Sequence, residues 1–296
     1  MTGLAQASAR VAICTVLRNE RPYILEWIAH HRLLGVEWFL MFDNESDDGS
    51  GPLLQALHAR GLATALAWPG RGMSRQTDAF GRGAAALANR CDFVAFIDLD
   101  EFLLTDDGET LPDALARLPA DAGALALCQR VFGAGGHSAF APGLVIERFT
   151  QRAADERDEH RWVKTIARPE CVRHFTSSHS VALSSGHTLM TDGAPFVALG
   201  HVGSADRIVH GGLRLNHYML KSREEYAAKQ RRGDFSDTAT ARRFSDDYFT
   251  ARDPACNELT DSLAAGRARA VRAEIARMIA DFPEAMRRQV EADIGP

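Results

Sequence analysis

Two aspartates one residue apart are the side chains in this sequence that are best suited to chemistry. Asp98 and Asp100 follow the apolar run 93–97 and precede a second apolar run, 102–104. Residues two apart on an extended segment point to the same side, so both carboxylates could coordinate one divalent cation. Oxygen ligands with open positions suit Mg²⁺ or Mn²⁺, and a diphosphate could fill those positions. The alternative is a solvated acidic turn, but carboxylates between apolar runs are costly without a compensating partner.

Two further polar clusters follow apolar runs in the same way and could contact a nucleotide. Their members are Arg18, Asn19, Glu20, Asp43 and Asn44. Asn19 could also cap a helix, which would not prevent a ligand contact. Asp43 opens the segment 43–49, whose Asn, Ser, Asp and Gly residues equally favour a simple turn. Nucleotide contact and turn therefore both stay open for this segment.

Several cationic and polar residues elsewhere could complete such a site. They are Arg75, Gln76, Lys164, Arg168, His217 and Lys221. His217 could supply a third metal ligand, and Lys221 could neutralise a departing diphosphate. Arg75 and Gln76 precede an Ala-rich segment and could meet the nucleotide. The alternative for each is a structural or surface role.

Strands and helices are predicted to alternate in the first half of the chain. The predicted strands are 11–17, 36–42, 63–68 and 92–97, and the predicted helices are 21–34, 52–60 and 77–90. This order indicates an α/β fold with a mostly parallel sheet and helices on both faces. Ligands of such sheets bind beyond the carboxyl ends of the strands. The polar clusters that follow these strands should therefore converge on one site.

The second half is less regular. Strands are predicted at 124–131, 161–168 and 197–201, and helices at 144–154, 222–232 and 262–282, with a glycine-rich loop at 132–137. We expect one compact domain over residues 1–235, with a nucleotide-binding half to about residue 120 and an acceptor half from 121. Residues 236–296 are expected to form a helical C-terminal extension.

Composition narrows the class of protein. The 296 residues carry a net charge of −5, which gives no indication of a nucleic-acid partner. The five cysteines are scattered without a CxxC pair, which favours a reducing compartment over a disulfide framework or zinc site. No signal peptide or transmembrane segment is recognised, so a cytoplasmic protein is expected. The Arg-rich tail helices could touch an anionic membrane, although mixed Arg and Glu is typical of a solvated helix face.

Several segments together resemble the glycosyltransferases of families 2 and 92. Those similar to the start of these families are 15–20, 25–31 and 34–36. Segment 42–49 looks like their uridine-contact strand end, and 96–102 resembles their metal-binding DxD motif. The segments similar to family 92 in particular are 131–133, 164–169 and 216–226. The resemblance covers roughly residues 10 to 235.

This resemblance implies a GT-A fold, a nucleotide-diphosphate sugar donor such as a UDP-sugar, and Mn²⁺ or Mg²⁺ as cofactor. It also implies transfer with inversion to a hydroxyl of a glycan or another acceptor. By match, Asp43 would contact the nucleoside, and Asp98 and Asp100 would hold the metal and the diphosphate. His217 would contact metal or phosphate.

The catalytic base has no clear match. Family 2 enzymes often place it in a Glu-Asp pair, which this sequence lacks. Asp192 is our choice, with Glu147, His137 and His179 as alternatives. Each of the four could equally be structural.

Two other functions remain open. A nucleotidyltransferase also sets carboxylates and a metal beside phosphate, but it normally has a glycine-rich loop after the first strand, where this chain has Arg18-Asn19-Glu20. A non-catalytic nucleotide-sugar or glycan-binding module is the second. The intact DxD disfavours such a module, and the unplaced base favours it.

Overall fold

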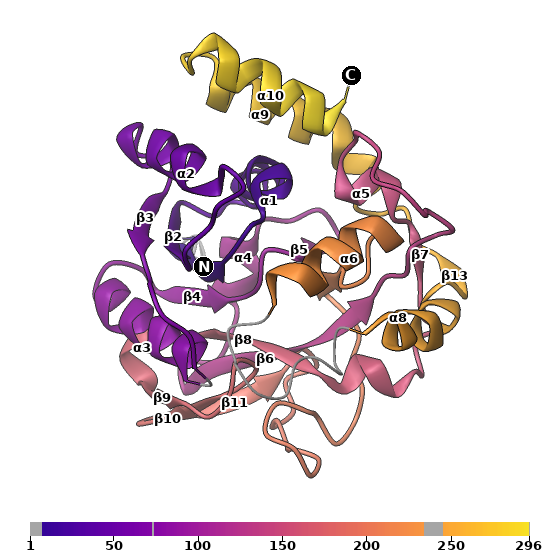
Figure 1. The fold of residues 1–296 in the computed structure, drawn as a ribbon. Coiled ribbons are helices and arrows are strands. Elements are labelled where there is room, and N and C mark those ends of the chain that lie inside the picture. Colours follow the sequence, from indigo (N-terminus) through magenta and orange to yellow (C-terminus); the bar gives the residue numbers. More distant parts are fainter. Residues whose placement is uncertain (1–7, 73, 234–244, 296) are drawn as a thin grey trace.

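A nine-stranded mixed sheet forms the centre of the molecule in the computed structural model, which describes residues 8–72, 74–233 and 245–295 (Figure 1). Eight strands follow in the order β3-β2-β1-β4-β8-β6-β12-β5, and β11 pairs with β6. Their bounds are β1 (Val11–Leu17), β2 (Trp38–Asp43), β3 (Thr64–Ala67), β4 (Phe93–Phe96), β5 (Glu101–Thr105), β6 (Ala122–Val131), β8 (Val163–Ala167), β11 (His187–Met190) and β12 (Leu213–His217). Two short pairs lie outside this sheet, β9 (Val172–Phe175) with β10 (Val181–Leu183) and β7 (Gln151–Arg152) with β13 (Leu259–Thr260).

Five of the eight strand pairings in the main sheet are parallel. β1 pairs in parallel with β2 and β4, β2 with β3, and β6 with β11 and β12. β8 runs antiparallel to β4 and β6, and β5 runs antiparallel to β12. The predicted α/β class with a mostly parallel sheet is therefore confirmed, and it agrees with the GT-A fold that the family resemblance implies.

Helices cover both faces of the sheet. They are α1 (Arg21–Leu33), α2 (Ser50–Ala59), α3 (Arg75–Leu87), α4 (Leu111–Ala116), α5 (Val145–Arg148), α6 (Arg223–Arg232), α8 (Asp246–Arg252), α9 (Ala268–Ile279) and α10 (Glu284–Ile294). Alternate residues of β1 enter two different cores: Val11 and Ile13 pack with α1 and α2, whereas Ala12 and Cys14 pack with α3. Because both faces of β1 are covered, all of its residues are buried, and all but Thr15 are apolar.

Helix α3 approaches β1 closely because it carries a glycine at the contact. A Cβ on Gly83 would lie 2.4 Å from Sγ of Cys14. A larger residue at Gly83 would push α3 away from the strand. This matters for function because Gln76, in the first turn of α3, reaches the acidic segment.

The structure differs from the prediction in several places, most of them in the second half. In place of the helix expected at 144–154, the chain forms only the four-residue helix α5. Strand β7 follows α5, and the backbone of β7 pairs with β13, more than 100 residues later in the sequence. The strand expected at 197–201 is absent from the described elements; these residues form a loop with an isolated bridge from Ala198 to Ala205. Strands β5 and β12 were not predicted, since each depends on the other as an antiparallel partner.

The C-terminal helices belong to the same hydrophobic core as α1. Val271 and Ile275 of α9 and Val290 of α10 are buried in the cluster that contains Trp27 and Ile28. Figure 1 shows α9 and α10 lying over α1. The boundaries predicted near residues 120 and 235 stay predictions, and residues 236–244 lie outside the described residues. None of the helices in the described ranges is long and apolar enough to cross a bilayer.

Candidate functional site

Two adjoining pockets lie at the carboxyl ends of the parallel strands. The larger pocket has a volume of about 550 Å³ and the smaller pocket about 150 Å³. Both are lined by Arg18, Glu20, Met219, Lys229, Arg232 and Gly233. The segment after β1, helix α6 and the residues that flank α6 thus form the common wall. The position is the one that sheet topology predicts for a ligand.

Asp98 and Asp100 both line the smaller pocket. The carboxylate of Asp98 accepts hydrogen bonds from Gln76 Nε2 at 2.6 Å and from Lys164 Nζ at 2.7 Å. The Lys164 side chain is only 1% exposed, and its ammonium also lies 3.5 Å from Glu101. A buried ammonium therefore compensates the acidic segment, which explains how carboxylates can sit between apolar runs.

Asp100 faces a lysine and a histidine. Lys229 Nζ donates to Asp100 Oδ2 at 2.6 Å, and His217 Nε2 lies 3.6 Å from Asp100 Oδ1. The orientation of the Gln129 amide is set by Nε2, which donates to the carbonyl of Glu159. The amide oxygen, Oε1, therefore faces His217 and lies 2.6 Å from Nδ1 of its ring. Nδ1 must carry a proton to donate to that oxygen. In the neutral ring, Nε2 therefore presents its lone pair towards Asp100.

Opposing effects set the pKa values of the acidic segment. Burial raises the pKa of Asp98, but the ammonium of Lys164 outweighs it, and the net pKa lies below the ordinary value. Burial likewise opposes the ionisation of Asp100, but the ammonium of Lys229 outweighs burial, and the pKa of Asp100 lies well below the ordinary value. Burial dominates at Glu101 and raises its pKa to about 7. Asp98 and Asp100 are therefore ionised at neutral pH.

The donor set of the smaller pocket fits a divalent cation. Asp98 and Asp100 offer ionised oxygens, and His217 offers an imidazole nitrogen whose other nitrogen is fixed by Gln129. The ammonium of Lys229 already lies against Asp100, so a cation would have to displace or share this partner.

A tighter trio of potential ligands occurs elsewhere. The ligand atoms of Asp155, His160 and His210 all lie within 4.8 Å of one another. Arg130 and Arg152 donate to the same oxygen of Asp155, at 2.8 and 2.9 Å. Two guanidinium groups at this carboxylate repel a cation, so the trio is a poor metal site.

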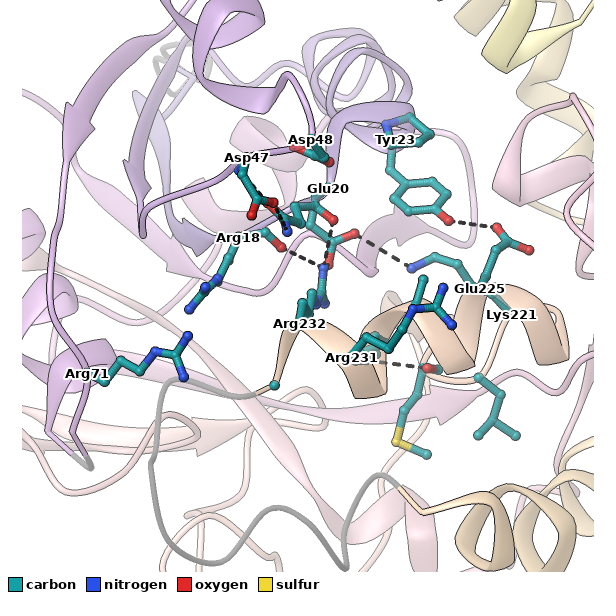
Figure 2. A pocket seen from close by; sticks show the side chains of 17 residues that line it. Arg18, Glu20, Tyr23, Asp47, Asp48, Arg71, Lys221, Glu225, Arg231 and Arg232 are labelled. Atoms are coloured by element: carbon teal, nitrogen blue, oxygen red, sulfur yellow. Dashed lines mark hydrogen bonds and ion pairs between the residues drawn. The ribbon is translucent and has the colours of Figure 1, made fainter.

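The larger pocket is rich in cations (Figure 2). Arg18 and Arg71 lie together at one end, and Lys221 lies beside Tyr23 at the other. Within the described part of the chain, neither Nε nor Nη1 of Arg18 has a hydrogen-bond partner, although both atoms are buried. Buried donors without partners are costly, and an anionic ligand would satisfy them.

Lys221 has a strained backbone, and its side chain lies between Glu20 and Tyr23. Its backbone has φ +53°, which a residue with a side chain rarely adopts. Its ammonium lies 4.0 Å from Glu20 and 4.2 Å from the centre of the Tyr23 ring. Burial lowers the pKa of Lys221, although Glu20 opposes this shift. A buried and strained lysine in a pocket is typical of a functional position.

Helix α6 carries cations into the common wall of the two pockets. Ser222 and Glu225 form a capping box that fixes the first turn of α6. Lys229 and Arg232 are three residues apart on this helix and so point to the same side. Arg232 pairs with Glu20 and donates to the carbonyl of Arg18 at 2.7 Å. The helix thereby ties the end of β1 to Asp100.

The structure brings most of the predicted site residues together. Those that line one or both pockets are Arg18, Asn19, Glu20, Gln76, Asp98, Asp100, His217 and Lys221. Asn19 has φ +53°, and its side chain exchanges hydrogen bonds with Asp47 instead of capping α1.

Three predicted donor contacts line neither pocket, and the structure shows each of them in contacts within the protein. Asn44 is fully buried and donates to the carbonyls of Trp68 and Gly70, each at 2.7 Å. Arg75 stacks 4.4 Å from the Trp68 ring centre, and Asp43 accepts the N–H of Ser46 at 3.2 Å. These contacts shape the two loops after β2 and β3.

Asp192, our choice of base, lies outside both pockets. Its carboxylate is 40% exposed and pairs with Arg207 at 2.6 Å. The pKa of Asp192 is lowered, chiefly by its hydrogen bond with Arg207, which makes it a weak base. Of the alternatives, Glu147 pairs with Arg272 at 2.6 Å, and the His137 ring packs on Phe149. His179 does line the smaller pocket.

Sequence reasoning missed Lys229 and Arg232. Their spacing on a predicted helix that follows Lys221 was visible, but a run of cations on a helix is more often a solvated face. Lys164 was recognised as a cation that could face phosphate, whereas its partners are Asp98 and Glu101.

Comparisons with known proteins identify the family of this chain. The model of glycosyltransferase family 92 matches residues 9–202. A family 92 protein from Oryza sativa subsp. japonica is 30% identical over 223 residues, which are 74% of this chain and 35% of that protein. One from Arabidopsis thaliana is 26% identical over 231 residues, which are 74% of this chain and 36% of that protein. The chain thus spans about a third of the length of the curated relatives it matches.

Likeness to solved structures is remote. S. aureus TarS 1-349 in complex with UDP-GlcNAc is 15% identical, with a TM-score of 0.37 and coverage of 68% of this chain and 62% of that chain. A likeness at this level carries no conclusion about function. The family model, in contrast, matches well over half of the sequence, and the chain belongs to glycosyltransferase family 92.

Proposed function

We propose that this chain is a metal-dependent, inverting glycosyltransferase whose donor is a nucleotide-diphosphate sugar, with a UDP-sugar as the first candidate. The acceptor is a hydroxyl of a glycan or another molecule. One observation carries the proposal: two ionised carboxylates line adjoining pockets at the carboxyl ends of β1 and β4 together with Arg18, whose buried Nε and Nη1 find no hydrogen-bond partner among the described residues. Family 92 membership supports the same reaction class.

The shapes and charges of the pockets suggest how the donor lies. The larger pocket, beside the ends of β1 and β2, suits the nucleoside. The diphosphate would lie where the two pockets join, beside the residues that line both, because Arg18, Lys229 and Arg232 supply positive charge there. The sugar would then lie in the smaller pocket beside Asp98 and Asp100. Uridine as the base follows from the family resemblance of segment 42–49.

Asp98, Asp100 and His217 are the residues that would hold a divalent cation. When bound, such a cation neutralises charge on the diphosphate. The chain's own cations have the same effect: Lys229 and Arg232 stabilise the negative charge that develops as the diphosphate leaves. An acceptor oxygen forms the new bond to the anomeric carbon while the bond from that carbon to the diphosphate breaks.

Release of nucleotide from UDP-glucose, UDP-galactose and UDP-N-acetylglucosamine tests this proposal. We expect wild type to release UDP with Mn²⁺, and chelation by EDTA to stop the release. Asp100→Asn should lower the rate by about 100-fold or more, because it removes a charged ligand of the cation. Asp121→Asn, the same change at an exposed position, is the matched control.

Three results would contradict the proposal. Release of sugar 1-phosphate in place of UDP would indicate transfer of the nucleotidyl group, as by a nucleotidyltransferase. Full activity in EDTA would exclude metal dependence. Wild-type activity of Asp100→Asn would remove Asp100 from the site.

A further inference from the structure

We propose that His179 is the catalytic base that accepts the proton of the acceptor hydroxyl. This assignment rests on the proposed glycosyltransferase function. His179 lies between β9 and β10, a hairpin beside the main sheet (Figure 1), and it lines the smaller pocket together with Asp98 and Asp100. Of the four candidate bases in the sequence, His179 is the one that lines this pocket.

The tautomer of His179 is set by the backbone. Its Nδ1 lies 2.9 Å from the carbonyl oxygen of Val163. A carbonyl oxygen can only accept, so Nδ1 carries the hydrogen. In the neutral imidazole, Nε2 is then the nitrogen with the basic lone pair. An imidazole oriented by a hydrogen bond at its other nitrogen is the arrangement that general-base catalysis requires.

The surrounding residues hold His179 in one place. Ser177 Oγ accepts its backbone N–H at 3.1 Å, and Thr165 Oγ1 donates to its backbone carbonyl at 2.9 Å. The Trp162 ring lies 5.0 Å from the imidazole ring, centre to centre. A Cβ on Gly203 would lie 2.4 Å from Cβ of His179, so only glycine allows this approach. A base held in this way needs little reorganisation before it accepts a proton.

The carboxylates of the smaller pocket are poor competitors. Asp98 pairs with Lys164, Asp100 with Lys229, and Glu20 with Arg232. A carboxylate that holds an ammonium or guanidinium group binds a proton weakly. His179 differs from these carboxylates because its Nδ1 donates to the carbonyl of Val163, which keeps Nε2 as the nitrogen that can accept a proton in the neutral ring.

The step balances as a single displacement. The O–H bond of the acceptor breaks, and its proton moves to Nε2 of His179. The acceptor oxygen bonds to the anomeric carbon, and the electron pair of the carbon–diphosphate bond leaves with the nucleoside diphosphate. Asp98 interacts favourably with the imidazolium that forms, since charge on His179 and ionisation of Asp98 favour each other. Without a sugar acceptor, water supplies the O–H.

His179→Asn tests the assignment, because the asparagine amide can keep the hydrogen bond to Val163 while Nε2 is lost. The readouts are kcat for UDP release from the best UDP-sugar and the Kd of UDP. We expect kcat to fall by about 100-fold or more with the Kd of UDP unchanged within about twofold. His201→Asn is the matched control, because exposed His201 stacks on Trp162 outside both pockets.

Two outcomes overturn the assignment while the proposed function stands. One is a kcat for His179→Asn within about threefold of wild type. The other is a loss of UDP affinity that accounts for the whole fall in rate. A wild-type chain that does not bind UDP overturns the proposed function, and this assignment with it.

Discussion

Lys164 is the buried cation on which the acidic segment depends. Its ammonium lies 2.7 Å from Asp98 and 3.5 Å from Glu101, and almost none of the side chain meets solvent. Burial lowers the pKa of Lys164, but the two carboxylates outweigh burial and raise it above the ordinary value. The lysine therefore stays charged and holds the geometry of the strand end that carries Asp98.

Replacing Lys164 by methionine should destabilise the fold as well as the site. The variant leaves Asp98 and Glu101 without their buried counter-ion, and breaking such a pair costs about 3 kcal/mol. Urea denaturation at pH 7.5 would measure the change in the free energy of unfolding. Arg173→Met, on an exposed strand, is the control and should change it by less than about 0.5 kcal/mol. Equal stability of the two variants would show that Lys164 is not the counter-ion.

The sequence predicts some of these residues better than others. Asp98 and Asp100 stand out because their pattern and their strand context are local. The counter-ions Lys164 and Lys229 come from elements 66 and 129 residues away from them, and no spacing rule links such pairs. For the same reason, the sequence led us to choose Asp192 over His179, although only His179 of the two lines the smaller pocket.

At the scale of elements, helix α1 protects the open edge of β5. β5 is the last strand of its sheet, and the backbone of Leu103 is satisfied by two histidines instead of a further strand. His30 Nε2 donates to the carbonyl of Leu103 at 2.7 Å, and His31 Nε2 accepts the N–H of Leu103 at 3.1 Å. His31 Nδ1 donates to the carbonyl of Trp27, which fixes the neutral tautomer. These contacts cover an edge that would otherwise be exposed and hold the strand that follows the DxD motif.

Acid should weaken this contact. Burial lowers the pKa of His30 to about 3 and the pKa of His31 well below its ordinary value of 6.5. Histidines that stay neutral when folded contribute stability above pH 6.5, and this contribution is lost as the pH falls from 6.5 towards 3. Buried Glu26 acts in the opposite direction, because burial raises its pKa to about 7 and its contribution is lost as the pH rises from 4.5 through 7.

The comparison of wild type with His31→Gln isolates the histidine contribution. Glutamine does not titrate, so the free energy of unfolding of the variant should fall less than that of wild type between pH 7 and pH 4.5. Urea denaturation at several pH values measures both curves, with Glu26 common to the two proteins. Parallel curves would mean that His31 does not titrate on unfolding in this range.

Local sequence patterns explain the elements of the first half. α1 and the strands β1 to β4 were predicted to within a few residues because each carries its own apolar period. β5 and β12 were missed because their pairing joins residues more than 100 positions apart. The prediction of a helix over 144–154 was wrong for the same reason, because residues 151–152 form β7, whose partner β13 lies in the C-terminal region.

At the scale of the whole molecule, the site is assembled from both halves of the chain. The segments that follow β1, β2 and β4 bring the acidic residues and Arg18. β12, α6 and the segment between them bring His217, Lys229 and Lys221. Figure 1 shows α6 lying across the sheet on the side of these strand ends. A nucleotide half without α6 would keep Arg18 but lack Lys229 and Arg232, the other two cations of the common wall. The pockets therefore depend on tertiary structure that no single motif contains.

Titration calorimetry of the whole chain with UDP and Mn²⁺ tests the central claim, a nucleoside-diphosphate site at the joined pockets, most directly. We predict saturable binding of one UDP per chain, weakened about tenfold or more in Arg18→Met, a loss of about 1.4 kcal/mol. Arg173→Met should bind like wild type. Absence of binding by wild type, or equal affinity of wild type and Arg18→Met, would contradict the account.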